Sequence, residues 1–108
     1  FIIVRSAVHQ IKPTANLMPY RYKSDFHVDL MDQLSFYGAV RRKGNLHFWC
    51  QAFGIESSKD KGITGLEVKD LFKKKEYLKI ARYCLDDVRA TKELFHIWDE
   101  YIRIPEYE

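Results

Sequence analysis

The longest regular pattern of apolar and polar residues lies at the C-terminal end of the chain. From Glu76 to Arg103, apolar or small residues recur at steps of three and four, as on one face of an α-helix. The members of this apolar stripe are Tyr77, Ile80, Ala81, Cys84, Val88, Thr91, Phe95, Trp98 and Ile102. The pattern predicts one long helix with this stripe as its packed face.

Shorter patterns upstream predict further helices. Apolar residues at helical spacing indicate a helix over about the first ten residues, which should end before Pro13. A second helix is expected over Asp32–Tyr37 and a third over Leu46–Phe53, where Gly54 suits a left-handed C-cap. The Thr-x-x-Glu form of residues 64–67 is that of a capping box, and it predicts a helix that continues through Phe72.

The remaining segments are expected to be loops, with one exception. Residues 13–24, 38–44 and 56–62 lack a helical period, whereas the alternation in residues 26–30 predicts one short edge strand. The sequence shows no series of strands that would form a parallel sheet of its own. We therefore expect a mainly α chain in which residues 1–108 form a single domain or part of one.

Composition places the chain among globular domains, since 46% of its residues are apolar and 31% are charged. No apolar run approaches the roughly 20 residues that span a bilayer, so no membrane partner is expected. Two cysteines, Cys50 and Cys84, are too few for a disulfide framework and favour a cytoplasmic location. The chain starts at Phe1, which indicates a processed product, a trimmed piece or the back part of a longer protein.

The net charge of +3 is too small to drive the chain onto a polyanion by itself. Basic residues nevertheless cluster at residues 41–43, at Lys59 and Lys61, and along residues 73–82, whereas residues 86–108 lean acidic. A solvated surface is the ordinary explanation of each cluster, and a face that binds phosphates is the alternative.

Tyr83 and Asp87 stand four residues apart on the long predicted helix and therefore share a face. At about 100° per residue, Asp87 lies about 60° from the centre of the apolar stripe and Asp86 about 160° from it. We expect Asp87 at the edge of the core and Asp86 facing water. A carboxylate at that edge can coordinate a metal ion, and a tyrosine hydroxyl can orient a water molecule. The spacing alone fits an ordinary surface aspartate beside a partly buried tyrosine equally well.

Three segments carry a family resemblance: HVDLMD at residues 27–32, KDKGITGL at residues 59–66 and ARYCLDDVRAT at residues 81–91. In this order they resemble the C-terminal part of a DnaQ-like 3′–5′ exonuclease of the ribonuclease H-like superfamily. The most similar group is the bacterial one related to the proofreading exonuclease domain of family B DNA polymerases. Residues 81–91 correspond to the third exonuclease motif.

The resemblance implies that the chain is the C-terminal helical part of an α/β ribonuclease H-like fold. It implies metal-dependent hydrolysis of phosphodiester bonds in single-stranded DNA, or RNA, with two divalent ions, Mg²⁺ or Mn²⁺, held by four acidic residues. Asp87 matches the last of these metal ligands, and Tyr83 matches the tyrosine that orients the attacking water. The first motif, Asp-x-Glu, is absent, and the second is expected upstream of Phe1. Since one carboxylate cannot hold a metal pair, we expect the 108 residues by themselves to be inactive.

Two further pairs have expected roles. Lys59 and Lys61 are the best candidates for contacts to nucleic-acid phosphates. Asp29 and Asp32 do not match catalytic acids of the family, so we expect a structural role, with Asp32 as a helix N-cap.

Other residue types invite a functional interpretation that we do not favour. His47 and Cys50 are spaced for one metal ion, but no second close pair completes a zinc site. Four aromatic residues occupy apolar stripes and are expected in the core rather than as stacking platforms for bases. They are Trp49, Phe53, Phe95 and Trp98.

A competing hypothesis needs no missing sequence. In it, the chain is a non-enzymatic helical module that binds nucleic acid or a protein partner through its basic helix faces. Under the exonuclease hypothesis, helix faces without their sheet would be exposed, so we also predict that the isolated chain self-associates.

Overall fold

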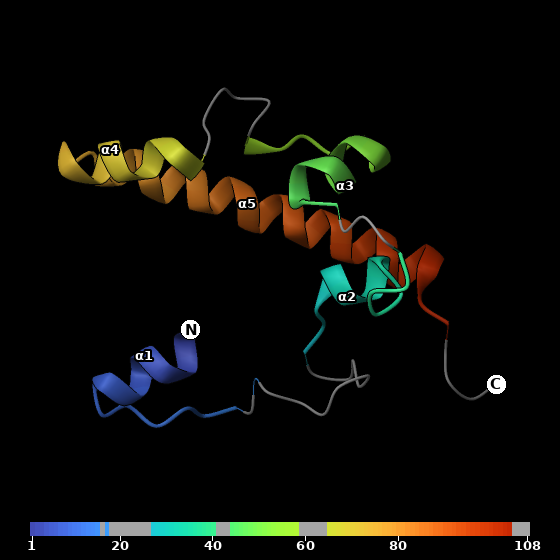
Figure 1. Ribbon diagram of the computed structural model, residues 1–108, viewed down its shortest axis with the longest axis horizontal. Helices are drawn as coiled ribbons and strands as arrows, with labels where there is room; N and C mark the ends of the chain where they lie inside the picture. Colours follow the sequence, from blue (N-terminus) through green and yellow to red (C-terminus); the bar gives the residue numbers. More distant parts are fainter. Residues whose placement is uncertain (16, 18–26, 41–43, 59–64, 105–108) are drawn as a thin grey trace. The chain divides into compact units, whose positions relative to one another are not determined.

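The computed structural model describes residues 1–15, 17, 27–40, 44–58 and 65–104. All regular elements among these residues are helices or helical turns, and none is a strand (Figure 1). The prediction of a mainly α chain is therefore confirmed. The chain divides into two compact units, Phe1–Arg41 and Arg42–Glu108, which are described separately.

The first unit contains two short helices, α1 (Ile2–Val8) and α2 (Leu30–Leu34). Helix α1 ends before Pro13, as predicted, and none of its residues is buried. Helix α2 has one buried residue, Leu34, which is 5% exposed.

Helix α2 occupies part of the segment that was expected to be an edge strand. Residues 27–29 have no regular structure and Leu30 already begins the helix, so the strand prediction is wrong for residues 27–30; residue 26 lies outside the described residues. The N-cap is Asp29, whose side chain accepts a hydrogen bond of 3.2 Å from the Asp32 backbone N–H. Asp32 is therefore not the cap but the residue that is capped. An aspartate satisfies a backbone N–H three residues later, so the earlier of the two aspartates starts the helix.

Helix α2 ends earlier than Tyr37, where the sequence pattern placed its end. Phe36, Tyr37 and Gly38 have positive φ values of 51°, 56° and 89°, which are incompatible with continuing a right-handed helix. The described part of the predicted turn at residues 38–44 follows directly.

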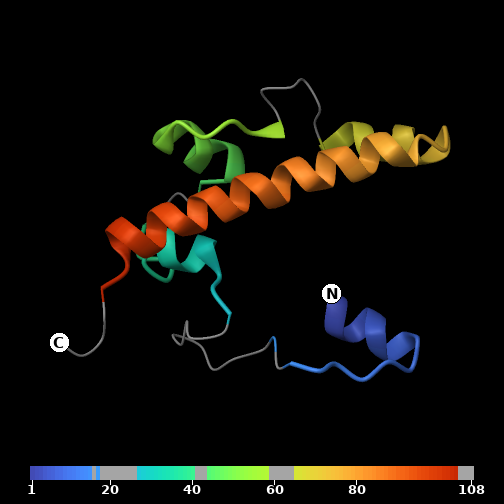
Figure 2. The same ribbon diagram turned by 180° about the vertical axis from the view of Figure 1, so that it is seen from behind.

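In the second unit, two short helices contact one long helix (Figures 1 and 2). Helix α3 (Leu46–Phe53) and helix α4 (Val68–Lys73) both contact α5 (Tyr77–Ile97), and α4 follows the 3₁₀ turn η2 (Gly65–Glu67). Both views show α4 beside the N-terminal part of α5 and α3 closer to its C-terminal end. The π-helix η3 (Trp98–Ile102) continues α5, so that α5 and η3 together match the long helix that the sequence predicts.

The ends of α3 follow from its flanking residues. The Asn45 side chain accepts a hydrogen bond of 2.8 Å from the Phe48 backbone N–H, and Gly54 closes the helix in the left-handed conformation. The prediction of this helix and of its glycine C-cap is confirmed. Helix α4 has no side-chain N-cap hydrogen bond, and Thr64 of the predicted capping box lies outside the described residues.

We expect Gly54→Ala to lower the free energy of unfolding by about 1 to 2 kcal/mol, because Cβ is disfavoured in the left-handed region. Gly54 has φ +71°, and a Cβ atom there would meet nothing within 4 Å, so the cost is conformational rather than steric crowding. Urea unfolding followed by circular dichroism measures it. Gly54→Asn is the matched control, since asparagine tolerates this conformation. Equal losses in the two variants would contradict the conformational explanation.

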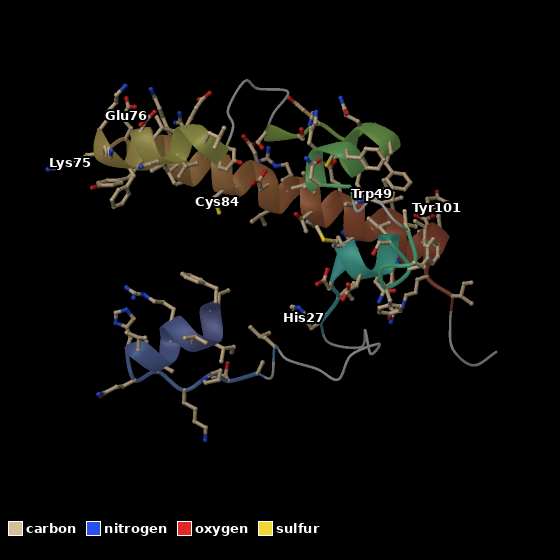
Figure 3. The ribbon with its side chains drawn as sticks, viewed as in Figure 1. His27, Trp49, Lys75, Glu76, Cys84 and Tyr101 are labelled. Atoms are coloured by element: carbon tan, nitrogen blue, oxygen red, sulfur yellow. The ribbon has the colours of Figure 1, made fainter. Side chains whose placement is uncertain are left out.

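The buried face of the long helix differs from the apolar stripe of the sequence. Ala90, Leu94 and Trp98, four residues apart, are each 2% exposed. Five members of the predicted stripe are instead exposed: Tyr77, Ala81, Cys84, Val88 and Thr91. Cys84, for example, lies on the side of α5 away from α4 (Figure 3). The prediction of a single packed stripe is wrong for these five, because the contacts of α3 and α4 decide which face is covered.

The four aromatic residues expected in the core are buried to different degrees. Trp98 is buried, which confirms its prediction, and its ring centroid lies 5.9 Å from that of Phe95. Trp49 and Phe95 are half-buried. Phe53 is 36% exposed and stacks on Trp49 at a centroid distance of 6.4 Å, so its core prediction is wrong.

Candidate functional site

Tyr83 and Asp87 lie one helical turn apart on α5, and both side chains are half-buried. Their side of the helix continues into the buried residues Ala90 and Leu94. Each of the two polar side chains lies close to a segment from elsewhere in the second unit. These neighbours define the candidate site.

The carboxylate of Asp87 is held by a buried serine. Ser58 Oγ donates a hydrogen bond of 2.9 Å to Asp87 Oδ1, and Ser58 itself is only 4% exposed. The two residues are 29 positions apart in the sequence, so the segment that follows α3 is brought against the middle of α5. Thr91 Oγ1 also bonds to Asp87, but it donates to the backbone carbonyl rather than to the carboxylate.

The preceding serine faces a different partner. Ser57 is 3% exposed, and its hydroxyl hydrogen-bonds His47 Nδ1 of α3 at 2.5 Å. Two adjacent buried serines therefore have hydroxyl contacts on different helices, Ser57 on α3 and Ser58 on α5.

The hydroxyl of Tyr83 lies close to the turn that opens α4. A Cβ atom at Gly65, the first residue of η2, would lie 3.6 Å from the Tyr83 hydroxyl oxygen, which is an ordinary van der Waals distance. The main chain of η2 therefore lies near this end of the candidate site. Gly65 and Ser58 flank residues 59–64, which are outside the described part of the chain.

Asp86 does not face water as predicted. Its side chain is 17% exposed, and Oδ1 lies 3.7 Å from Nη1 of Arg89 in an ion pair. The error follows from the wrong choice of the buried face. Because the packed side of α5 is centred near Tyr83, Asp87 and Ala90, Asp86 lies at its edge rather than opposite to it.

The other predicted site residues are not part of this arrangement. Lys59 and Lys61 lie outside the described residues. His47 contacts Ser57, and Cys50 is fully buried on α3; both cysteines are free. In the parts of the chain that the structure describes, no three His, Cys, Asp or Glu residues are grouped to hold a metal ion.

The donor chemistry fits a metal site only in part. Asp87 offers a half-buried carboxylate, the hard oxygen ligand that Mg²⁺ and Mn²⁺ prefer. A single carboxylate is one ligand of such a site and not a complete one. Such a site therefore needs further ligands beside Asp87.

The sequence pattern does not indicate the contacts that Ser58 and Gly65 make. Both residues fall in or beside a polar stretch that has no periodicity. Their place in the site depends on contacts with Asp87 and Tyr83, which lie far along the chain. The position of Gly65 in the matched segment KDKGITGL was the one available signal.

Among the described residues, no helix combines the length and the apolar character that a bilayer-spanning segment requires.

No curated protein and no solved structure matches the chain significantly. A family model described as a predicted 3′–5′ exonuclease related to the exonuclease domain of PolB matches residues 9–101. The matched range includes Tyr83, Asp87, Ser58 and Gly65, and it confirms the resemblance carried by the three sequence segments. The chain therefore belongs to the family of predicted 3′–5′ exonucleases related to the exonuclease domain of PolB.

Proposed function

We propose that this chain is the C-terminal part of a metal-dependent 3′–5′ exonuclease domain that hydrolyses single-stranded DNA. Asp87 would be one metal ligand, and Tyr83 would orient the attacking water. The observation that carries the proposal is the pairing of a tyrosine and an aspartate on one side of α5, within the range of the family match.

Three features of the site support these roles. Tyr83 and Asp87 are one turn apart, so a phenol and a carboxylate can act on one substrate group. Both are half-buried, which reduces competition from bulk water without removing access. The Asp87 carboxylate is held by Ser58 across the fold.

The chemistry divides between the metal ions and the chain. Divalent ions, when bound, supply an activated water and neutralise charge on the phosphate and the leaving oxygen. Asp87 would contribute a negatively charged oxygen ligand to that site. The Tyr83 hydroxyl would hydrogen-bond the water and fix its direction toward the phosphorus atom.

The remaining carboxylates are proposed to lie in sequence outside this chain. One aspartate with a tyrosine does not bind a pair of divalent ions, so the 108 residues alone should not degrade nucleic acid. Activity is therefore expected of the complete protein only.

The nucleic-acid contacts are proposed for Lys59 and Lys61. Lys59 directly follows Ser58 in the sequence, and Ser58 is bonded to Asp87. Lysines this close in sequence to a residue of the site would contact the backbone phosphates of the strand end. Self-association of the isolated chain and a cytoplasmic location stay predictions.

The proposal is tested by degradation of a 5′-labelled single-stranded DNA by the complete protein. We expect the labelled strand to be shortened stepwise from its 3′ end in Mg²⁺. Shortening should stop in excess chelator and resume when Mg²⁺ or Mn²⁺ is restored. Denaturing gels resolve the steps. An RNA of the same sequence determines which sugar the site accepts.

Two controls define the reaction. A strand whose 3′ end is blocked should resist degradation, whereas a 5′-blocked strand should not. Shortening that persists after complete chelation would contradict metal dependence. Cleavage inside a circular single strand would contradict exonuclease action.

A further inference from the structure

We propose that Ser58 is a positioning residue for Asp87, holding the carboxylate in the orientation in which it receives a metal ion. The proposal rests on the proposed function, since it assigns Ser58 a role toward the same site. It goes beyond the family match because it names a residue outside the Tyr-x-x-x-Asp pattern of α5.

The contact has the geometry of an ordinary hydroxyl hydrogen bond. Ser58 Oγ lies 2.9 Å from Asp87 Oδ1, within the range for a hydroxyl that donates to a carboxylate. A carboxylate bonded at one oxygen has less freedom to rotate, so its second oxygen is presented in a restricted set of directions. Partners that orient a ligating carboxylate in this way commonly govern metal affinity.

Ser58 is itself held in place. It is 4% exposed, so bulk water has little access to its hydroxyl. Ser58 lies shortly after α3 in the sequence, and α3 packs on α5. The serine is therefore fixed by the packing of two helices, whereas an exposed loop serine would lose more freedom on forming the same bond.

The local alternatives to this role are weaker. Thr91 also bonds to Asp87, but through the backbone carbonyl, so it does not orient the carboxylate. Arg89 forms an ion pair with Asp86, the adjacent residue. In the described part of the chain, Ser58 is the side chain shown bonded to the Asp87 carboxylate.

The test measures Mn²⁺ affinity of the complete protein by isothermal titration calorimetry and by the electron paramagnetic resonance signal of free Mn²⁺. We expect Ser58→Ala to weaken Mn²⁺ binding about 10-fold, the lower end of the usual effect of losing such a partner. Nuclease rates at saturating Mn²⁺ should fall less than rates at limiting Mn²⁺.

Ser57→Ala is the matched control. It removes the same atom from a neighbouring serine of similar burial, whose hydroxyl bonds to His47 on α3. We expect this variant to bind Mn²⁺ like the wild type. A 10-fold loss in both variants would mean that the serine pair is only structural, and would overturn the proposal.

A second pair of variants keeps the test independent of folding defects. Ser58→Thr and Ser58→Val have nearly the same shape and place the same extra bulk in the buried site, but only threonine retains the hydroxyl. The Ser58→Thr variant should bind Mn²⁺ about 10-fold more tightly than the Ser58→Val variant. Equal affinities for this pair would overturn the proposal even if both variants lose stability.

Failure of this inference differs from failure of the proposed function. A wild-type protein that binds no Mn²⁺ and does not shorten DNA would contradict both. A wild-type protein that binds Mn²⁺ and shortens DNA, with Ser58→Ala equal to it in both measurements, would contradict the role of Ser58 alone.

Discussion

Asp87→Asn is expected to reduce single-strand degradation by the complete protein about 100- to 1,000-fold. Asparagine keeps the size of the side chain but removes the negative charge that binds a hard divalent ion. A loss of about 3 to 4 kcal/mol of charge stabilisation in the transition state corresponds to that factor in rate. Single-turnover rates with a 5′-labelled strand measure the change, and Mn²⁺ titration of the same variant reports the lost ligand separately.

Asp86→Asn is the matched control for this result. Asp86 is the next residue on the same helix and is also half-buried, and its ion pair is with Arg89, which is largely exposed. Removing its charge should change the rate less than about 3-fold, because only Asp87 matches a metal ligand of the family and an ion pair with a largely exposed arginine contributes little. Wild-type rates in Asp87→Asn would contradict the assignment of Asp87 as a ligand. Equal losses in both variants would indicate a general electrostatic requirement instead.

Trp98→Ala is expected to cost about 3 to 5 kcal/mol of the free energy of unfolding. Trp98 is 2% exposed, its ring packs near Phe95, and the Arg103 guanidinium lies 5.4 Å from its ring centroid. Truncation removes these contacts and leaves a cavity. Because small domains are stable by only about 5 to 15 kcal/mol, the variant should be largely unfolded well below the wild-type transition. Urea and thermal unfolding followed by circular dichroism measure the loss.

Val88→Ala is the informative comparison for the tryptophan. Both residues belong to the apolar stripe that the sequence shows, but Val88 is 58% exposed. Its truncation should change the stability of the isolated chain by less than about 0.5 kcal/mol. A loss at Val88 as large as the loss at Trp98 would mean that the whole stripe is packed, as the sequence pattern alone predicts.

Local signals in the sequence were sufficient for most helices. The apolar spacing within Leu46–Phe53 and the glycine that follows it are local signals, so the pattern predicted α3 closely. The period of three and four predicted the long helix over α5 and η3 for the same reason. The prediction failed at the start of α2, where a short alternating run fitted both a strand and a capped helix, and Asp29 decided between them.

The sequence by itself determined the helical character of the chain, its family segments and the Tyr83–Asp87 spacing, because each depends on residues close together along the chain. Only the tertiary structure decided which side of α5 is buried, since that depends on where α3 and α4 pack. It also brought Ser58 to Asp87, across 29 positions of sequence. A hydrogen bond between distant segments leaves no periodic trace in the sequence, so only the packing of the helices could reveal it.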